Sequence, residues 1–265
     1  MVGCAMVGVV VLLALLSAFW TPWPPTQVST LRLAAPSADH WMGTDGFGQD
    51  IFSRILIGAR SCLLVGVVAV GIGALIGVPL GIIAAINRDL LGRVIMRATD
   101  IVYAFPALLL AIILAAARGS GSTLTAMVAI GIASIPAFAR NSRGAALQVL
   151  SQDFILAARG AGIRRRGIAM RHVLPNITPV ILVQGSVSFG LAILAEASLS
   201  YLGLGTPPTT PTWGRMIFEA QPYLYSDPIL AFWPGLFIAI AVLGFNLLGD
   251  GLRELLDPTL READR

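Results

Sequence analysis

The sequence has no lysine, little charge and almost no histidine or cysteine, and each shortage excludes a class of function. Charged residues make up 12% of the 265 residues, whereas 56% are hydrophobic and the mean hydropathy is +0.82. A soluble domain of this length cannot bury so much apolar surface, so an ordinary water-soluble enzyme is excluded. Without lysine the phosphate-binding pattern Gly-x-x-x-x-Gly-Lys-Ser/Thr cannot occur, so this type of ATP site is absent.

The scarce residues also argue against metals, nucleic acids and catalysis. Cys4 and Cys62 both lie within apolar runs, which argues against a disulfide framework or a metal site. The net charge is +4, but the arginines lie between apolar runs instead of forming one basic stripe, so no nucleic-acid partner is expected. The apolar runs hold no paired acids, His-rich box or Ser/Lys dyad, so we expect no catalytic residue.

Six long apolar runs divide the chain. They cover residues 2–20, 62–86, 101–117, 122–139, 173–195 and 229–249. Each is close to the about 20 residues that a helix needs to cross a bilayer. We therefore predict an all-α polytopic membrane protein with six transmembrane helices. A cleaved signal peptide is the alternative for the first run, but the run has no basic start and no small-x-small cleavage site.

Arginine placement predicts the orientation. If both termini lie on one side, thirteen of the 18 arginines lie on that side too. The opposite side then holds Arg32, Arg54, Arg60, Arg118 and Arg215. The positive-inside rule places both termini in the cytoplasm, with residues 21–61 and 203–228 outside.

The segment before the second run has apolar residues at helical spacing. They are Ile51, Ile55, Leu56 and Ala59. We predict a short amphipathic helix at the membrane surface, with Asp50 at its N-terminus, where the helix dipole favours an acid. A metal site formed by Asp39, His40, Asp45 and Asp50 is the alternative, although no repeated ligand spacing supports it.

Residues 151–176, between the fourth and fifth runs, are the most informative part of the chain. Small residues would let another surface approach a helix closely; they are Ala157, Ala158, Ala161 and Gly162. Gly162 permits a turn and Pro175 prevents the next helix from extending backward along the chain, so we predict a helix-turn-helix lying flat under the membrane. Its arginines, Arg164 to Arg166 among them, could alternatively hold anionic lipid headgroups.

This segment resembles the EAA loop of ABC importer permeases, the element that docks into a groove on the cytoplasmic ATPase. The resemblance rests on Ala157-Ala158, on Gly162 four residues later, and on His172-x-Leu174-Pro175-Asn176. The family pattern has Glu before the two alanines, where this sequence has Leu156. The resemblance implies that the ATPase-coupling residues are Ala157, Ala158, Arg159, Gly162, Arg164, Arg165, His172 and Pro175.

Further blocks in the same order resemble the C-type permease subunit of dipeptide, oligopeptide and nickel importers. They are residues 42–45, 50–54, 58–61, 96–100, 104–106, 171–176, 196–205 and 246–253. The resemblance implies a type I ABC importer permease fold, with a core at 61–250. Residues 1–60 would add a first helix and an outer segment, and 251–265 would form a short cytoplasmic tail.

The resemblance also implies partners and a cargo. The partners would be a second homologous permease, two ATP-binding subunits or one fused ATPase, and an external substrate-binding protein. ATP and Mg would lie on the ATPases, so this chain itself would bind no cofactor. The cargo would be di- or oligopeptides crossing a bacterial plasma membrane, with nickel chelates, glutathione or haem as alternatives.

Polar residues near the ends of the runs have two interpretations. Glu196 and Ser200 could line the translocation path or form hydrogen bonds at a helix interface. Asn246 is expected to make an interhelical hydrogen bond, and Asp100 to lie near Arg97. An ion-coupled secondary transporter would need coupled intramembrane ionisable groups and inverted repeats, and only Glu196 comes close.

Two further sets have structural interpretations. A glycine stripe in the second run favours close helix packing, with a channel lining as the alternative: Gly66, Gly71, Gly73, Gly77 and Gly81. Aromatic residues around the last run are typical of an interfacial belt, with a surface for the binding protein as the alternative: Trp213, Tyr223, Tyr225 and Trp233.

Overall fold

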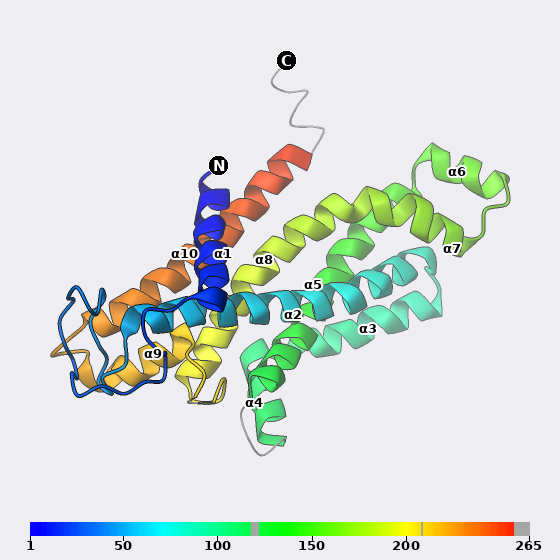
Figure 1. The fold of residues 1–265 in the computed structure, drawn as a ribbon. Coiled ribbons are helices and arrows are strands. Elements are labelled where there is room, and N and C mark those ends of the chain that lie inside the picture. Colours follow the sequence, from blue (N-terminus) through cyan, green and yellow to red (C-terminus); the bar gives the residue numbers. More distant parts are fainter. Residues whose placement is uncertain (118–121, 208, 257–265) are drawn as a thin grey trace.

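The computed structural model describes residues 1–117, 122–207 and 209–256, which form helices joined by loops (Figure 1). The helices are α1 (Val2–Phe19), α2 (Ile51–Ile86), α3 (Leu90–Ala104), α4 (Ala107–Ala117), α5 (Thr123–Leu150), α6 (Asp153–Gly160), α7 (Arg165–Ile168), the π turn η1 (Ala169–Val173), α8 (Leu174–Tyr201), α9 (Trp213–Ala220), the 3-10 turn η2 (Gln221–Tyr223) and α10 (Ile229–Leu256). Arg118 and the predicted tail at 257–265 lie outside the described residues.

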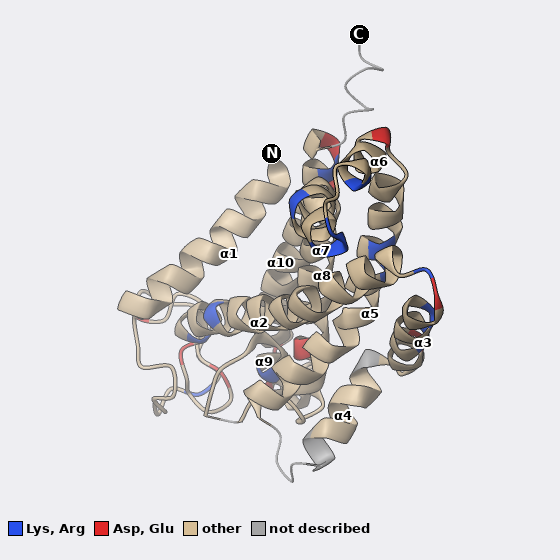
Figure 2. Ribbon diagram, turned by 90° about the vertical axis from the view of Figure 1, so that its right-hand side faces the viewer, with Lys and Arg blue, Asp and Glu red and all other residues tan. Residues whose placement is uncertain are grey.

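The membrane-spanning character of the fold is confirmed. Within the described residues, α1, α2, α5, α8 with its preceding turns, and α10 are long and apolar enough to cross a membrane. The bent pair α3 and α4 gives a sixth candidate span. The start of α1, the end of α10, and α6 with α7 lie toward one end of the molecule (Figure 2). The segment between α1 and α2 lies toward the other end.

The predicted separate surface helix before the second span is wrong, because α2 runs unbroken from Ile51 to Ile86. Asp50 does cap this helix, as predicted, since its side chain accepts a hydrogen bond from the Ser53 backbone N–H. The apolar side of the first turns is buried in protein: Ile55 has no exposed surface. The apolar spacing therefore predicts the helix correctly, but its apolar side packs against α1 and α9 and not against lipid.

The third predicted span is wrong as a single straight helix starting at residue 101. The helix α3 begins at Leu90 and stops at Phe105, and α4 continues after a bend of 86°. Pro106 explains the break, because a residue before proline is pushed out of the helical region. The ψ of Phe105 is 124°, which is extended backbone.

Close packing between α2 and α5 forms the centre of the fold. A Cβ on Gly77 would lie 2.6 Å from the backbone oxygen of Ile135 in α5, so only glycine allows this approach. The predicted packing stripe is confirmed at Gly66, Gly73, Gly77 and Gly81 and is wrong at Gly71, where a Cβ would meet open space.

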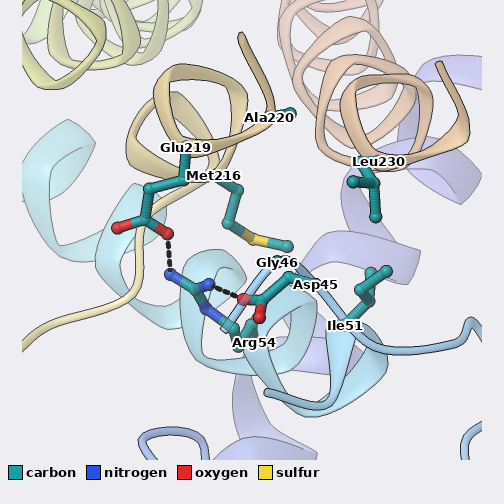
Figure 3. A pocket seen from close by; sticks show the side chains of 8 residues that line it. All are labelled: Asp45, Gly46, Ile51, Arg54, Met216, Glu219, Ala220 and Leu230. Atoms are coloured by element: carbon teal, nitrogen blue, oxygen red, sulfur yellow. Dashed lines mark hydrogen bonds and ion pairs between the residues drawn. The ribbon is translucent and has the colours of Figure 1, made fainter. Parts of the chain in front are cut away.

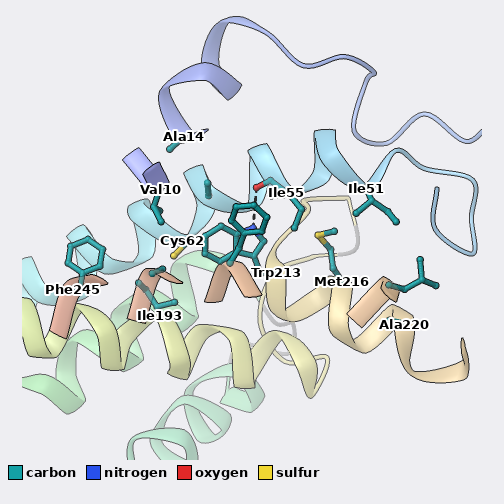
Figure 4. Packing of buried hydrophobic residues seen from close by; sticks show 14 residues of the cluster. Val10, Ala14, Ile51, Ile55, Cys62, Ile193, Trp213, Met216, Ala220 and Phe245 are labelled. Carbon is teal, nitrogen blue, oxygen red and sulfur yellow. Dashed lines mark hydrogen bonds between the residues drawn. The ribbon is translucent and has the colours of Figure 1, made fainter. Parts of the chain in front are cut away.

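A second core joins α1, α2, α9 and α10 (Figure 4). Trp213 is 2% exposed and its indole N–H donates to the backbone oxygen of Ile55 at 3.1 Å. Its ring fits because Gly58 has no side chain: a Cβ there would lie 2.4 Å from the indole. Trp213 therefore belongs to the core and not to the predicted interfacial belt, whereas Tyr225 is fully exposed.

Candidate functional site

The 151–176 segment forms the predicted helix-turn-helix. Helix α6 ends in a Schellman motif, in which Ile163 N–H donates to Ala158 O at 3.1 Å and Gly162 N–H to Arg159 O at 3.0 Å. Gly162 has a φ of +80°, a conformation that glycine adopts without steric cost. The sequence therefore ends the helix at the glycine that we expected to permit a turn.

One side of the segment is fixed to the spans. Ile155 and Val173 have no exposed surface, and Ala158 is 7% exposed. Ile155 and Val173 belong to a single apolar cluster that also includes side chains of α2, α5, α7 and α8: Val78, Ile82, Phe138, Ala146, Leu150, Ile168 and Ile177. Ile155 of α6 therefore belongs to the same close-packed cluster as side chains of three spans.

The other side of the segment faces away from the chain. Leu156 is 59% exposed and Phe154 is 46% exposed, and Ala157, which follows Leu156, is exposed as well. The segment also carries exposed arginines that have no ion pair within the described residues: Arg159, Arg164, Arg166 and Arg171. Arg165 is held by the turn after α2, where it donates to Asn87 Oδ1 at 2.9 Å.

His172 and Pro175 lie where the segment joins α8. The His172 ring lies 6.1 Å from the Phe154 ring, so it ties this junction to α6. Pro175 lies in the first turn of α8, which follows directly on α7 and the π turn η1. Proline lacks the N–H of a regular helical turn, and a π turn before it accommodates that loss.

Glu196 and Ser200 lie inside the chain. Glu196 is 4% exposed, and its Oε1 accepts from Ser200 Oγ at 2.6 Å and from Thr206 Oγ1 at 3.4 Å. The carboxyl group thus ties the end of α8 to the loop that follows. Asn246 lies against α8, where a Cβ on Gly190 would be 3.5 Å from its Oδ1.

An ion-pair network lies near α9, and sequence reasoning missed it. Arg54 is 2% exposed and bonds Asp45 and, at 2.7 Å, Glu219 (Figure 3). Arg215 bonds the other oxygen of Glu219 at 2.8 Å. We call these four residues the Arg54 network. The one signal of this network in the sequence is Arg54 itself, which lies in the first turn of an apolar helix. A charge that becomes buried there needs an acidic partner.

The acidic residues of the alternative metal site make hydrogen bonds and ion pairs within the chain. Asp50 accepts from Ser53 and lies 2.9 Å from Nδ1 of His40, while Asp45 pairs with Arg54. In the described parts of the chain no group of three or more His, Cys, Asp or Glu could hold a metal ion.

Asp100 lies three residues from Arg97 on α3, and its ion pair is with another helix. It bonds Arg140 of α5 at 2.8 Å, and the Arg140 guanidinium lies 4.0 Å from the centre of the Tyr103 ring. The contact joins α3 to α5. A pairing across 40 residues cannot be deduced from helical spacing.

Comparison with known proteins identifies what the chain is similar to. The family described as binding-protein-dependent transport system inner membrane component matches residues 77–262. The glutathione transport system permease protein GsiD of Pectobacterium atrosepticum is 44% identical over 260 residues, which is 96% of this chain and 86% of that protein. The dipeptide transport system permease protein DppC of Alkalihalophilus pseudofirmus is 43% identical over 230 residues, 87% and 75% of the two chains.

Among solved structures, a chain of the inward-facing MetNI methionine ABC transporter has the same fold. The TM-score is 0.64 at 19% sequence identity, over 76% of this chain and 94% of that chain. The predicted importer permease fold is therefore confirmed.

Proposed function

The chain belongs to the family of binding-protein-dependent transport system inner membrane components, and we propose that it imports short peptides by docking its 151–176 segment onto a partner ATPase. It is a multi-pass bacterial inner-membrane protein and the permease subunit of an ABC importer. Importers of this family work with ATPase and substrate-binding partners. We propose residues 61–250 as the transport core and 1–60 as an added first helix with an outer segment.

The two-sided structure of the 151–176 segment supports the docking proposal. Ala157, Arg159 and Gly162 lie on the exposed side, where a partner would contact them. Ala158 and His172 instead hold the segment to the spans. A partner that moves α6 would therefore move α2, α5 and α8 through the apolar cluster beneath it.

The exposed arginines fit a partner with an acidic rim. Arg164 and Arg166 carry charges that nothing in the described chain neutralises, and they flank exposed apolar side chains such as Leu156. A protein interface commonly combines an apolar centre with a polar rim. Leu156 stands where the family has Glu, so here the centre of the interface is more apolar.

The proposed assembly contains a second homologous permease, two ATP-binding subunits or one fused ATPase, and an external substrate-binding protein. ATP and Mg would be bound by the ATPases, since this chain has no lysine for a phosphate-binding loop. The partner ATPases would then hydrolyse ATP, and this chain would change conformation in response.

The proposed cargo is a di- or tripeptide. Relatives at 43% and 44% identity are named for dipeptide and for glutathione transport, and glutathione is itself a tripeptide. Both cargoes share the amide groups of a short peptide, which is the chemistry that a common path would have to accept.

Uptake into proteoliposomes tests this function. The chain is reconstituted with its cognate permease, ATPases and binding protein, and labelled dipeptides, tripeptides and glutathione are offered with and without enclosed ATP. We expect uptake that needs both ATP and the binding protein. Uptake driven by a proton gradient without ATP would overturn the proposal, and ATP-driven uptake of nickel chelate or haem but no peptide would overturn the cargo.

A further inference from the structure

Two carboxamides meet between the helices α5 and α8. Asn141 of α5 donates from Nδ2 to Oε1 of Gln184 in α8, and Gln184 Nε2 donates to Ser188 Oγ at 2.9 Å. Asn141 is exposed and Gln184 is half-buried, while Ser188 is 6% exposed. Asn141 and Gln184 are therefore accessible on the surface of this chain, and Ser188, which accepts a hydrogen bond from Gln184, is buried behind them.

Both carboxamides lie well inside their helices. Asn141 is nine residues from the end of α5 at Leu150 and Gln184 is ten residues from the start of α8 at Leu174, each about 15 Å along the axis. Gln184 lies within the fifth apolar run, and polar side chains in the membrane-spanning part of a helix face protein or water and not lipid. Asn141 lies two residues beyond the fourth run, between Arg140 and Arg143. The neighbour of this face is therefore something other than acyl chains.

The same face of α5 lacks large apolar side chains on either side of Asn141. At helical spacing it presents Ala133, Ala137, Gly144 and Gln148, which are exposed or half-buried. It lies between the contact of Arg140 with α3 and the contact of Asn141 with α8. A lipid-facing strip would instead carry residues such as Leu182, which is 49% exposed on the opposite side of α8 from Gln184.

The pair has hydrogen-bonding capacity to spare. Within the described residues, nothing donates to Oδ1 of Asn141, and one N–H of Gln184 Nε2 makes no bond. One free acceptor and one free donor match the N–H and C=O of a peptide bond. A carboxamide carries no charge, so it accepts the backbone of a peptide whatever its side chains are.

The two helices that meet here are the ones that the 151–176 segment connects. Helix α5 ends at Leu150 just before α6, and α7 continues through η1 into α8. A movement of α6 therefore changes the position of α5 relative to α8, and the Asn141–Gln184 contact lies on the boundary between them. A path that opens and closes with ATPase movement has to be lined by such a boundary.

From these contacts we infer that Asn141 and Gln184 line the translocation path and hydrogen-bond to the backbone of the passing peptide. The inference rests on the proposed function, since it names residues that would contact the proposed cargo. It differs from the sequence expectation for Glu196 and Ser200, whose hydrogen bonds are satisfied inside the chain.

Cysteine labelling in the assembled importer tests the placement. Asn141→Cys, Gln184→Cys and the control Leu182→Cys are each made in a chain whose Cys4 and Cys62 are replaced by alanine. A charged, membrane-impermeant thiol reagent is added during turnover. We expect it to modify positions 141 and 184 but not 182, and we expect a transported dipeptide with the binding protein to slow the modification.

Labelling that fails at 141 and 184, or a disulfide that readily forms between either position and the second permease, would overturn the inference in favour of a subunit interface. Uptake supplies the second arm. Asn141→Leu and Gln184→Leu should each lower peptide uptake about two- to tenfold, the loss of one hydrogen bond, while the ATPases stay bound.

The two proposals fail in different ways. If the unaltered importer takes up peptide and both leucine variants do so equally well, the inference fails and the proposed function stands. If the unaltered importer takes up no peptide, the proposed cargo fails, and slowing of the labelling by the compound that it does transport would still support the path.

Discussion

The two ends of this molecule use arginine in opposite ways. At one end Arg54 is 2% exposed and both its partners, Asp45 and Glu219, belong to the same chain. At the other end Arg159 and Arg164 are exposed and have no ion pair in the described residues. The difference teaches that the buried charge of Arg54 has its acidic partners within this chain, whereas the exposed arginines of the 151–176 segment have none in the described residues, which supports the proposed docking of that segment. Each prediction below tests this contrast.

The largest expected effect is at the 151–176 segment. Ala157→Arg should reduce uptake to background and release the ATPases, because a long side chain would occupy the exposed face that they approach. The chain itself should stay folded, since position 157 is exposed. Copurification of the ATPases and thermal denaturation of the purified permease measure the two effects. Ala157 is a cleaner site than Gly162, whose φ of +80° would add strain to any substitution.

The matched control is Gly251→Arg. Gly251 lies near the end of α10, toward the same end of the molecule, and a Cβ there meets open space. The control should retain the ATPases. Equal loss in both variants would mean that added bulk or charge at this end is harmful wherever it is placed, and the docking assignment would then lack support.

The second prediction concerns the Arg54 network. Arg54→Met leaves Asp45 and Glu219 partly buried without their central partner, which should cost about 3–5 kcal/mol in the free energy of unfolding. Arg215→Met is the control, because its side chain is 18% exposed and Glu219 keeps Arg54. It should cost about 1 kcal/mol or less. Thermal denaturation compares them, and similar losses would contradict the view that burial makes Arg54 special.

Local signals in the sequence predict two of the helix boundaries. Asp50 precedes an apolar periodic run and Gly162 follows two alanines, so each marks a boundary through its own backbone chemistry. The six apolar runs likewise predict the spans, since length and hydropathy are properties of a single segment. The continuity of α2 across Arg54 and Arg60 was missed, because charges were read as the ends of a span.

Partners across the fold could not be predicted. Trp213 is typical of a membrane interface by residue type, yet Gly58 opens a place for it in the core. The contact between Asn141 and Gln184 is not predicted, because a single carboxamide has no distinguishing pattern until its partner is known. Sequence periodicity identifies a face of a helix, whereas only the fold identifies what lies opposite that face.

The third prediction tests the α2 and α5 packing on which both ends depend. Gly77→Leu should destabilise the permease by about 1–3 kcal/mol or more, because the Cβ would lie 2.6 Å from the Ile135 backbone oxygen. Gly71→Leu should have little effect, since a Cβ there meets open space on the same helix. Denaturation midpoints in detergent compare the two. A stable Gly77→Leu protein would show that the helices can separate without loss.

The smallest expected difference compares two glycines with nearly the same backbone. Gly48 has a φ of 78° and Gly162 a φ of 80°, so alanine should cost about 1–2 kcal/mol of strain at either position. A Cβ on Gly48 would also lie 2.3 Å from the backbone oxygen of Ser29, whereas Gly162 has open space. Gly48→Ala should therefore destabilise the protein more, and hydrogen exchange should show the effect of Gly162→Ala confined to α6. If both substitutions lower the stability equally, the surroundings of Gly48 and Gly162 are equally well packed, and the 151–176 segment is not the more open of the two regions.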